Sequence, residues 1–159
     1  MQDDPRTFLL NLFNTAVAEV APENCLLPFV PVCPKGRAII VGAGKSAAAM
    51  AQVLEGAMAA WPDVTGLVIT PYGHGLTTRV IEVAEASHPV PDHAGECATR
   101  RIKRLVEGLD SNDLVICLIS GGGSALLSSP AKGLSLEDKQ SVTQDLLRCG
   151  ATITEINTV

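Results

Sequence analysis

The segment Arg37-Ala38-Ile39-Ile40-Val41-Gly42-Ala43-Gly44-Lys45-Ser46-Ala47 joins an apolar run to a helix-forming run through two glycines. The β-branched residues that end at Val41 predict a short strand, and Gly42 and Gly44 predict an abrupt turn. From Lys45 to Ala60 nearly every residue is a strong helix former. A strand, a glycine turn and a helix in this order are typical of an α/β protein with a parallel sheet.

Outward from this segment, apolar runs of strand length alternate with helical periodicity, and the connections are too long for hairpins. We therefore predict the α/β class with a mostly parallel sheet. The expected strands cover residues 37–41, 67–70, 80–86 and 114–119, and the expected helices cover residues 8–20, 45–60, 92–107 and 136–149.

Two details of these elements follow from local chemistry. Ser135 followed by Asp138 predicts a capping box at the last helix, and Asp92 is placed to cap the helix that it precedes. The run 114–119 is apolar throughout, which predicts a central strand with both faces covered and Cys117 buried within it.

Composition limits the function classes. The 159 residues are 47% hydrophobic and carry a net charge of -5 without a basic excess, which argues against nucleic acid as a partner. No apolar run reaches the roughly 18 residues of a membrane span and the start lacks a signal-peptide core, so we expect a cytoplasmic protein. The five cysteines form no C-x-x-C pair, so neither a disulfide framework nor a metal site is expected.

The first glycine turn has the spacing G-x-G-x-x-A, which presents the N–H groups of a helix start to an anion. It is not a Walker A loop, because Ile39 stands where that motif needs glycine. It is also not a full dinucleotide motif, because the next strand closes with Ile69-Thr70-Pro71 rather than with an acidic residue. Lys45 lies against the positive end of the helix dipole, a position that favours an anionic ligand.

A second glycine loop, Ser120-Gly121-Gly122-Gly123-Ser124, follows the strand 114–119. Three consecutive glycines cost conformational entropy that a simple connector does not require, so we expect this loop to approach a ligand. His88 lies in a proline-flanked segment at the same expected sheet edge and is a candidate to contact substrate or act as a base. His74 is a weaker candidate, and His93 is expected at the surface.

Several motifs in order along the chain resemble those of the type II glycerate 2-kinases, a family also labelled hydroxypyruvate reductases. They are Gly42-Ala43-Gly44-Lys45, His88-Pro89-Val90-Pro91-Asp92, Ile119 through Leu126, and Gly150-Ala151-Thr152-Ile153 with Glu155-Ile156-Asn157-Thr158-Val159. The resemblance implies that the α/β fold is a Rossmann-like three-layer sandwich with a mostly parallel sheet. It also implies ATP-dependent phosphorylation of D-glycerate to 2-phosphoglycerate, with ATP and Mg²⁺ as cofactors. It implies a catalytic Lys45, nucleotide-binding Gly42, Gly44 and Ser120 to Ser124, and substrate-binding His88 and Asn157.

The family pattern continues beyond residue 159, so the resemblance implies that residues 1–159 are an incomplete first domain of a two-domain kinase. The missing C-terminal domain is then a partner of this chain, activity of the fragment alone is doubtful, and homo-oligomerisation stays open.

Three alternatives remain open at this stage. A NAD(P)H-dependent hydroxypyruvate reductase would use the first glycine turn. A sugar-phosphate-binding isomerase-type domain has a similar Gly42 to Ser46 segment, although its serine-rich second loop is missing here. A ligand-binding fragment without turnover is the third.

Overall fold

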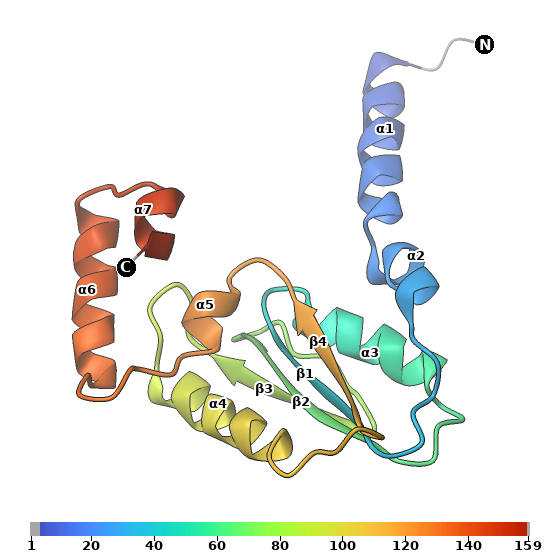
Figure 1. The fold of residues 1–159 in the computed structure, drawn as a ribbon. Coiled ribbons are helices and arrows are strands. Elements are labelled where there is room, and N and C mark those ends of the chain that lie inside the picture. Colours follow the sequence, from blue (N-terminus) through green and yellow to red (C-terminus); the bar gives the residue numbers. More distant parts are fainter. Residues whose placement is uncertain (1–3, 159) are drawn as a thin grey trace.

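The structure, a computed structural model, describes residues 4–158. Its centre is a parallel four-stranded sheet in the order β3-β2-β1-β4 (Figure 1). The strands are β1 (Ala38–Ala43), β2 (Val64–Pro71), β3 (Ile81–Ala86) and β4 (Leu114–Ile119). Ala43 aligns with Ile69 on one side and with Ile119 on the other, so β1 and β4 end at the same level and β2 continues for two more residues, to Pro71. The predicted α/β class with a parallel sheet is confirmed.

Helices cover the two faces of the sheet and give it three layers (Figure 1). On one face α3 (Ala47–Ala57) packs Ala51 and Leu54 against Ile40. On the other face α4 (His93–Leu105) contributes Ala98 and Ile102 to a second core. Each core is aliphatic and built on alternate residues of β1, because successive side chains of a strand point to opposite faces.

The outer elements surround this body. They are α1 (Pro5–Glu19), α2 (Pro22–Cys25), the 3₁₀ helix η1 (Leu27–Phe29), α5 (Gly123–Leu126), α6 (Leu136–Arg148) and α7 (Ile153–Thr158). Figure 1 shows α1 on one side of the molecule and α6 with α7 on the other, each standing away from the sheet. The predicted capping box is present at the start of α6, and Asp92 caps α4 through the N–H of Gly95 at 2.9 Å.

The prediction of a central, fully covered strand at 114–119 is wrong for this structure. β4 is an edge strand, and Val115 and Ile119 are 38% and 58% exposed. Cys117 is likewise exposed rather than buried. These side chains share the face that α4 covers over β2 and β3, but within residues 4–158 no helix extends over β4 on that face.

The crossover from β2 to β3 contains no helix, and α3 holds it in place instead. Gln52 donates to the carbonyl of Thr77 at 2.9 Å. The buried Glu55 carboxylate accepts from the backbone N–H groups of Arg79 at 2.8 Å, Val80 at 2.6 Å and Ile81 at 3.0 Å. Burial of Glu55 favours its protonated form, but these N–H groups outweigh burial and lower its pKa. The buried carboxylate is therefore fully partnered and fixes the end of the crossover.

Candidate functional site

The two glycine loops meet at the carboxyl edge of β1 and β4. The N–H of Lys45 donates to the carbonyl of Gly121 at 2.9 Å, and the N–H of Ser46 donates to the Ser120 hydroxyl at 2.9 Å. The N–H of Ser120 donates in turn to the carbonyl of Ala43 at 3.1 Å. Segments about 75 residues apart in sequence therefore form one hydrogen-bonded unit at the start of α3.

Glycine is required where these loops touch. Gly44 has φ of +138°, a conformation that side chains rarely adopt, and a Cβ there would lie 2.2 Å from the Ser120 hydroxyl oxygen. A Cβ on Gly42 would lie 2.1 Å from the carbonyl oxygen of Leu118. The first glycine turn is therefore explained by close approach of β4 and its loop, which the sequence alone does not reveal.

His88 lies directly against the second glycine loop. Gly122 has φ of +86°, and a Cβ on it would lie 2.7 Å from Nε2 of His88. The histidine is half-buried, and burial, followed by the nearby charge of Lys45, lowers its pKa. The imidazole is therefore neutral at neutral pH and is able to accept a proton at the edge of the loop.

Tyr72 is a neighbour of this edge that the sequence analysis did not single out. It follows β2, and its hydroxyl donates to Oδ2 of Asp92 at 2.7 Å. Burial of Asp92 favours its protonated form, but the N–H of Gly95 and the Tyr72 hydroxyl outweigh burial and lower its pKa. The carboxyl end of a parallel strand is where such folds bind ligands, and that position was the available signal for Tyr72.

Charge at the meeting point of the loops is positive. The Lys45 side chain is exposed, and within residues 4–158 no carboxylate pairs with it. The N–H groups at the start of α3 add the positive end of its dipole. An uncompensated cation beside two glycine loops is an arrangement suited to an anion.

The other predicted residues do not join this cluster. Asn157 lies on α7, and among the described residues no hydrogen bond connects it to His88 or to either glycine loop. His74 is exposed in the crossover, and the His93 side chain is 72% exposed at the start of α4. The structure thus brings together Lys45, His88 and both glycine loops, and leaves Asn157 apart.

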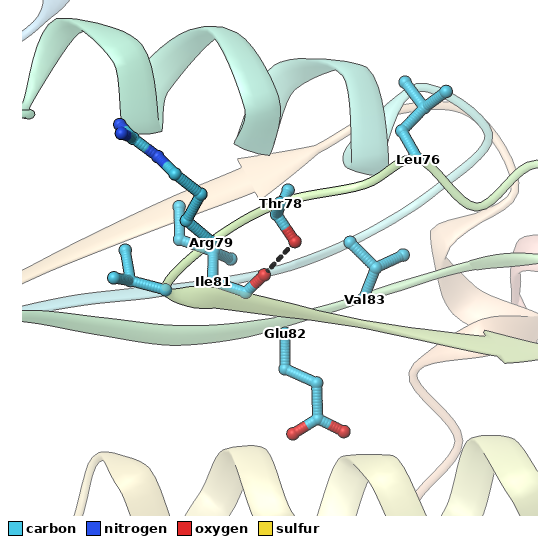
Figure 2. Close-up of a pocket in the computed structure, with 7 residues that line it drawn as sticks. Leu76, Thr78, Arg79, Ile81, Glu82 and Val83 are labelled. Atoms are coloured by element: carbon cyan, nitrogen blue, oxygen red, sulfur yellow. Dashed lines mark hydrogen bonds between the residues drawn. The ribbon is translucent and has the colours of Figure 1, made fainter.

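Two surface hollows lie along β3, away from the glycine loops. One of about 370 Å³ is shown in Figure 2, where Thr78 donates to the carbonyl of Ile81 and Glu82 points to the α4 side. It is lined by Leu76, Thr78, Arg79, Val80, Ile81, Glu82 and Val83. A second hollow of about 300 Å³ includes Arg101 and Arg104. Neither is lined by the glycine loops, because these occupy a sheet edge that is open on its outer side.

Within residues 4–158 no group of three or more His, Cys, Asp or Glu side chains is arranged to hold a metal ion. A search of the same residues finds no helix with the length and apolar character of a membrane span.

Comparisons with known proteins extend this description. Residues 8–159 match the family model described as "Domain of unknown function (DUF4147)". An Agrobacterium vitis protein named "Putative hydroxypyruvate reductase" is 49% identical over 97% of the chain. The D-glycerate 2-kinase of Thermotoga maritima is 38% identical over 94%, and the glycerate 2-kinase of Pyrococcus horikoshii is 41% identical over 98%. The chain spans only 35% to 38% of the length of these relatives.

Solved structures agree with this relationship. The crystal structure of the glycerate kinase of Thermotoga maritima matches with a TM-score of 0.81 and 37% identity, over 96% of this chain and 37% of its own. A Pyrococcus horikoshii protein matches with a TM-score of 0.79 and 34% identity, over 99% of this chain and 38% of its own. The chain therefore belongs to the DUF4147 family, and it corresponds to about one third of relatives that include glycerate kinases.

Proposed function

We propose that this chain forms the phosphate-handling part of a glycerate 2-kinase, which transfers the γ-phosphoryl group of ATP to the 2-hydroxyl of D-glycerate. The carrying observation is the joined pair of glycine loops beside Lys45, a cation without a carboxylate partner among residues 4–158. The names of the Thermotoga and Pyrococcus relatives support the assignment of the reaction.

In this proposal a bond forms between the glycerate oxygen and the γ-phosphorus while the bond from that phosphorus to the ADP oxygen breaks. The N–H groups of Lys45, Ser46 and Ser120 are already bonded within the loops. Lys45 Nζ and the N–H groups of Gly121 and Gly122 therefore stabilise the negative charge on the transferred group. His88, which lies against Gly122, takes the hydroxyl proton, since its lowered pKa keeps it neutral and able to accept one. The products are 2-phosphoglycerate and ADP.

Mg²⁺ enters this scheme as part of the substrate, bound to the phosphates of ATP. Among residues 4–158 no group of three or more His, Cys, Asp or Glu side chains is arranged to hold a metal ion, so we assign no residue of this chain to Mg²⁺. Its contribution when bound is to neutralise phosphate charge.

The second wall of the site belongs, in the same proposal, to a further domain of a longer protein. The glycine loops lie at an open sheet edge, and the relatives are nearly three times as long as the matched segment. Asn157 lies on α7, and within residues 4–158 it makes no hydrogen bond to the loops. It contacts the substrate in this proposal only if the further domain holds glycerate between α7 and His88.

The reductase is the second candidate, favoured by the name of the Agrobacterium relative that is 49% identical. Against it stands the end of β2, which closes with Ile69, the fully buried Thr70 and Pro71, so the strand itself supplies no acidic side chain for a ribose. The two candidates differ in the co-substrate that they consume.

A chimera tests the proposal. In it, residues 1–159 replace the matching segment of the Agrobacterium relative. We expect ATP-dependent consumption of D-glycerate, with a product that enolase converts directly because the phosphoryl group is on the 2-hydroxyl. Lys45→Ala should abolish turnover, whereas Lys139→Ala, which removes an exposed lysine of α6, should not. Oxidation of NADH or NADPH with hydroxypyruvate, without use of ATP, would establish the reductase instead.

A further inference from the structure

The helix α1 is amphipathic, yet it has no core beneath it. Phe8, Leu9, Leu12, Phe13 and Val17 lie along one side at helical spacing, and each is at least 50% exposed. No residue of α1 is buried, although Asp4 caps its first turn. Polar residues, among them Asn11 and Asn14, occupy the opposite side.

An apolar face of this width is the pattern of a helix that packs against a protein core. The largest exposed fraction among these five side chains is that of Phe13, at 65%. A membrane surface is a poor match, because helices that lie on membranes carry lysine and arginine on the polar face, whereas α1 carries the single cation Arg6 and ends in Glu19.

The two solved structures contain protein beyond the segment that matches this chain. A superposition that covers 96% of the chain in one case and 99% in the other includes most of the 15 residues of α1. Both proteins therefore contain a segment that matches most of α1. In each of them more than 60% of the chain lies outside the matched segment and is available to cover the helix.

The edge strand β4, like α1, has apolar side chains that no other element covers among residues 4–158. Parallel sheets are normally covered on both faces, but Val115 and Ile119 are exposed on the face away from α3. A single additional body of protein would supply what both α1 and β4 lack.

We infer that α1 is a docking helix whose apolar side binds the remaining part of the longer polypeptide to which this chain belongs. The inference shares with the proposed function only the premise of a longer protein. It assigns α1 a role in holding the two parts together, and it makes no use of the phosphate loops.

Hydrogen exchange measures this directly. We expect the amides of residues 5–19 to exchange at least about tenfold more slowly in the chimera described above than in the 159-residue chain, because packing suppresses local opening. Leu9→Asp with Phe13→Asp should remove that protection and lower the unfolding midpoint of the chimera by more than about 4 °C. The same pair should leave the midpoint of the 159-residue chain unchanged.

Asn11→Asp with Asn14→Asp is the matched control, since it adds the same two charges to the polar side of α1 and should change neither protein. Equal exchange of α1 in the two proteins would overturn the inference. The inference would also be overturned if the protection of α1 in the 159-residue chain rose with protein concentration while the measured mass doubled. The apolar side of α1 would then bind a second copy of the chain. If the chimera does not fold, the same exchange measurement on the unmodified Agrobacterium relative decides, and fast exchange of its matching segment overturns the inference.

The kinase assay separates this inference from the proposed function. An inactive chimera with a protected α1 would refute the kinase and leave the docking role standing. An active chimera that tolerates Leu9→Asp with Phe13→Asp, without loss of protection or stability, would refute the docking role alone.

Discussion

Glu55→Gln is the sharpest test of how α3 fixes the crossover between β2 and β3. Both oxygens of Glu55 accept hydrogen bonds: Oε1 accepts from Val80, Ile81 and, at 3.0 Å, Arg79, and Oε2 accepts from Arg79 at 2.8 Å. Glutamine keeps one acceptor oxygen but places an NH₂ group against the N–H of Arg79. The hydrogen bond from Arg79 to Oε2, a bond to a charged group worth about 1.5–3 kcal/mol, is lost, and the three bonds to Oε1 become neutral, so we expect a destabilisation of about 2–4 kcal/mol.

The stability difference between the wild-type and Glu55→Gln chains should depend on pH in a predictable direction. The pKa of Glu55 is lowered below 4.5 in the folded chain, so its contribution is fully present above about pH 4.5 and is lost as the pH falls through the folded pKa. The stability gap between the wild-type and Glu55→Gln chains should therefore be largest at neutral pH and shrink towards pH 3.

Urea unfolding followed by circular dichroism at pH 7, 5 and 3 measures both effects. Glu107→Gln is the control, because Glu107 is exposed at the end of α4 and accepts no hydrogen bond among the described residues. A Glu55→Gln chain within about 0.5 kcal/mol of wild type at pH 7, the range of ordinary surface substitutions, would refute the proposed anchoring.

Three further predictions concern the site and the chain's ion pairs. Gly122→Ala should destabilise more than Gly108→Ala in urea unfolding: both positions have positive φ, at a cost of about 1–2 kcal/mol, but only at Gly122 does the new Cβ meet His88. Equal losses would contradict the contact. NMR titration should place the pKa of His88 below 6.5 and move it upward in Lys45→Ala, since Lys45 contributes to the lowering. An unchanged midpoint would remove Lys45 as a cause. Asp113→Asn should weaken the chain at pH 7, and this loss should shrink as the pH falls towards 2, because hydrogen bonds from Arg37 hold the pKa of Asp113 at about 2; a loss that is independent of pH would contradict this.

The strands and most helices could be predicted because their signals are local. The run Leu114–Ile119 has the predicted bounds, and Ser135 with Asp138 forms the predicted capping box. Pro22 follows the expected helix 8–20 and begins α2, since proline is favoured in the first turn of a helix.

The contacts that build the candidate site are not local, and the sequence could indicate only part of them. Strand order brought the loops of β1 and β4 to one edge, as the glycine patterns suggested. Gly44 must accommodate the hydroxyl of Ser120, and Glu55 anchors a crossover that contains no helix. Both contacts join side chains to segments that are distant in the sequence. The periodicity of apolar residues along the sequence does not reveal contacts of this kind.

The open edge of β4 has a consequence for handling the chain. Leu114 to Ile119 contains no charged residue and no proline, so its free backbone groups offer a template for strand pairing between molecules. Natural edge strands usually guard against such aggregation with a charge. A lysine in place of the exposed Val115 would supply that guard in the 159-residue chain, while in a longer protein that covers β4 the same charge would be buried and would impair folding.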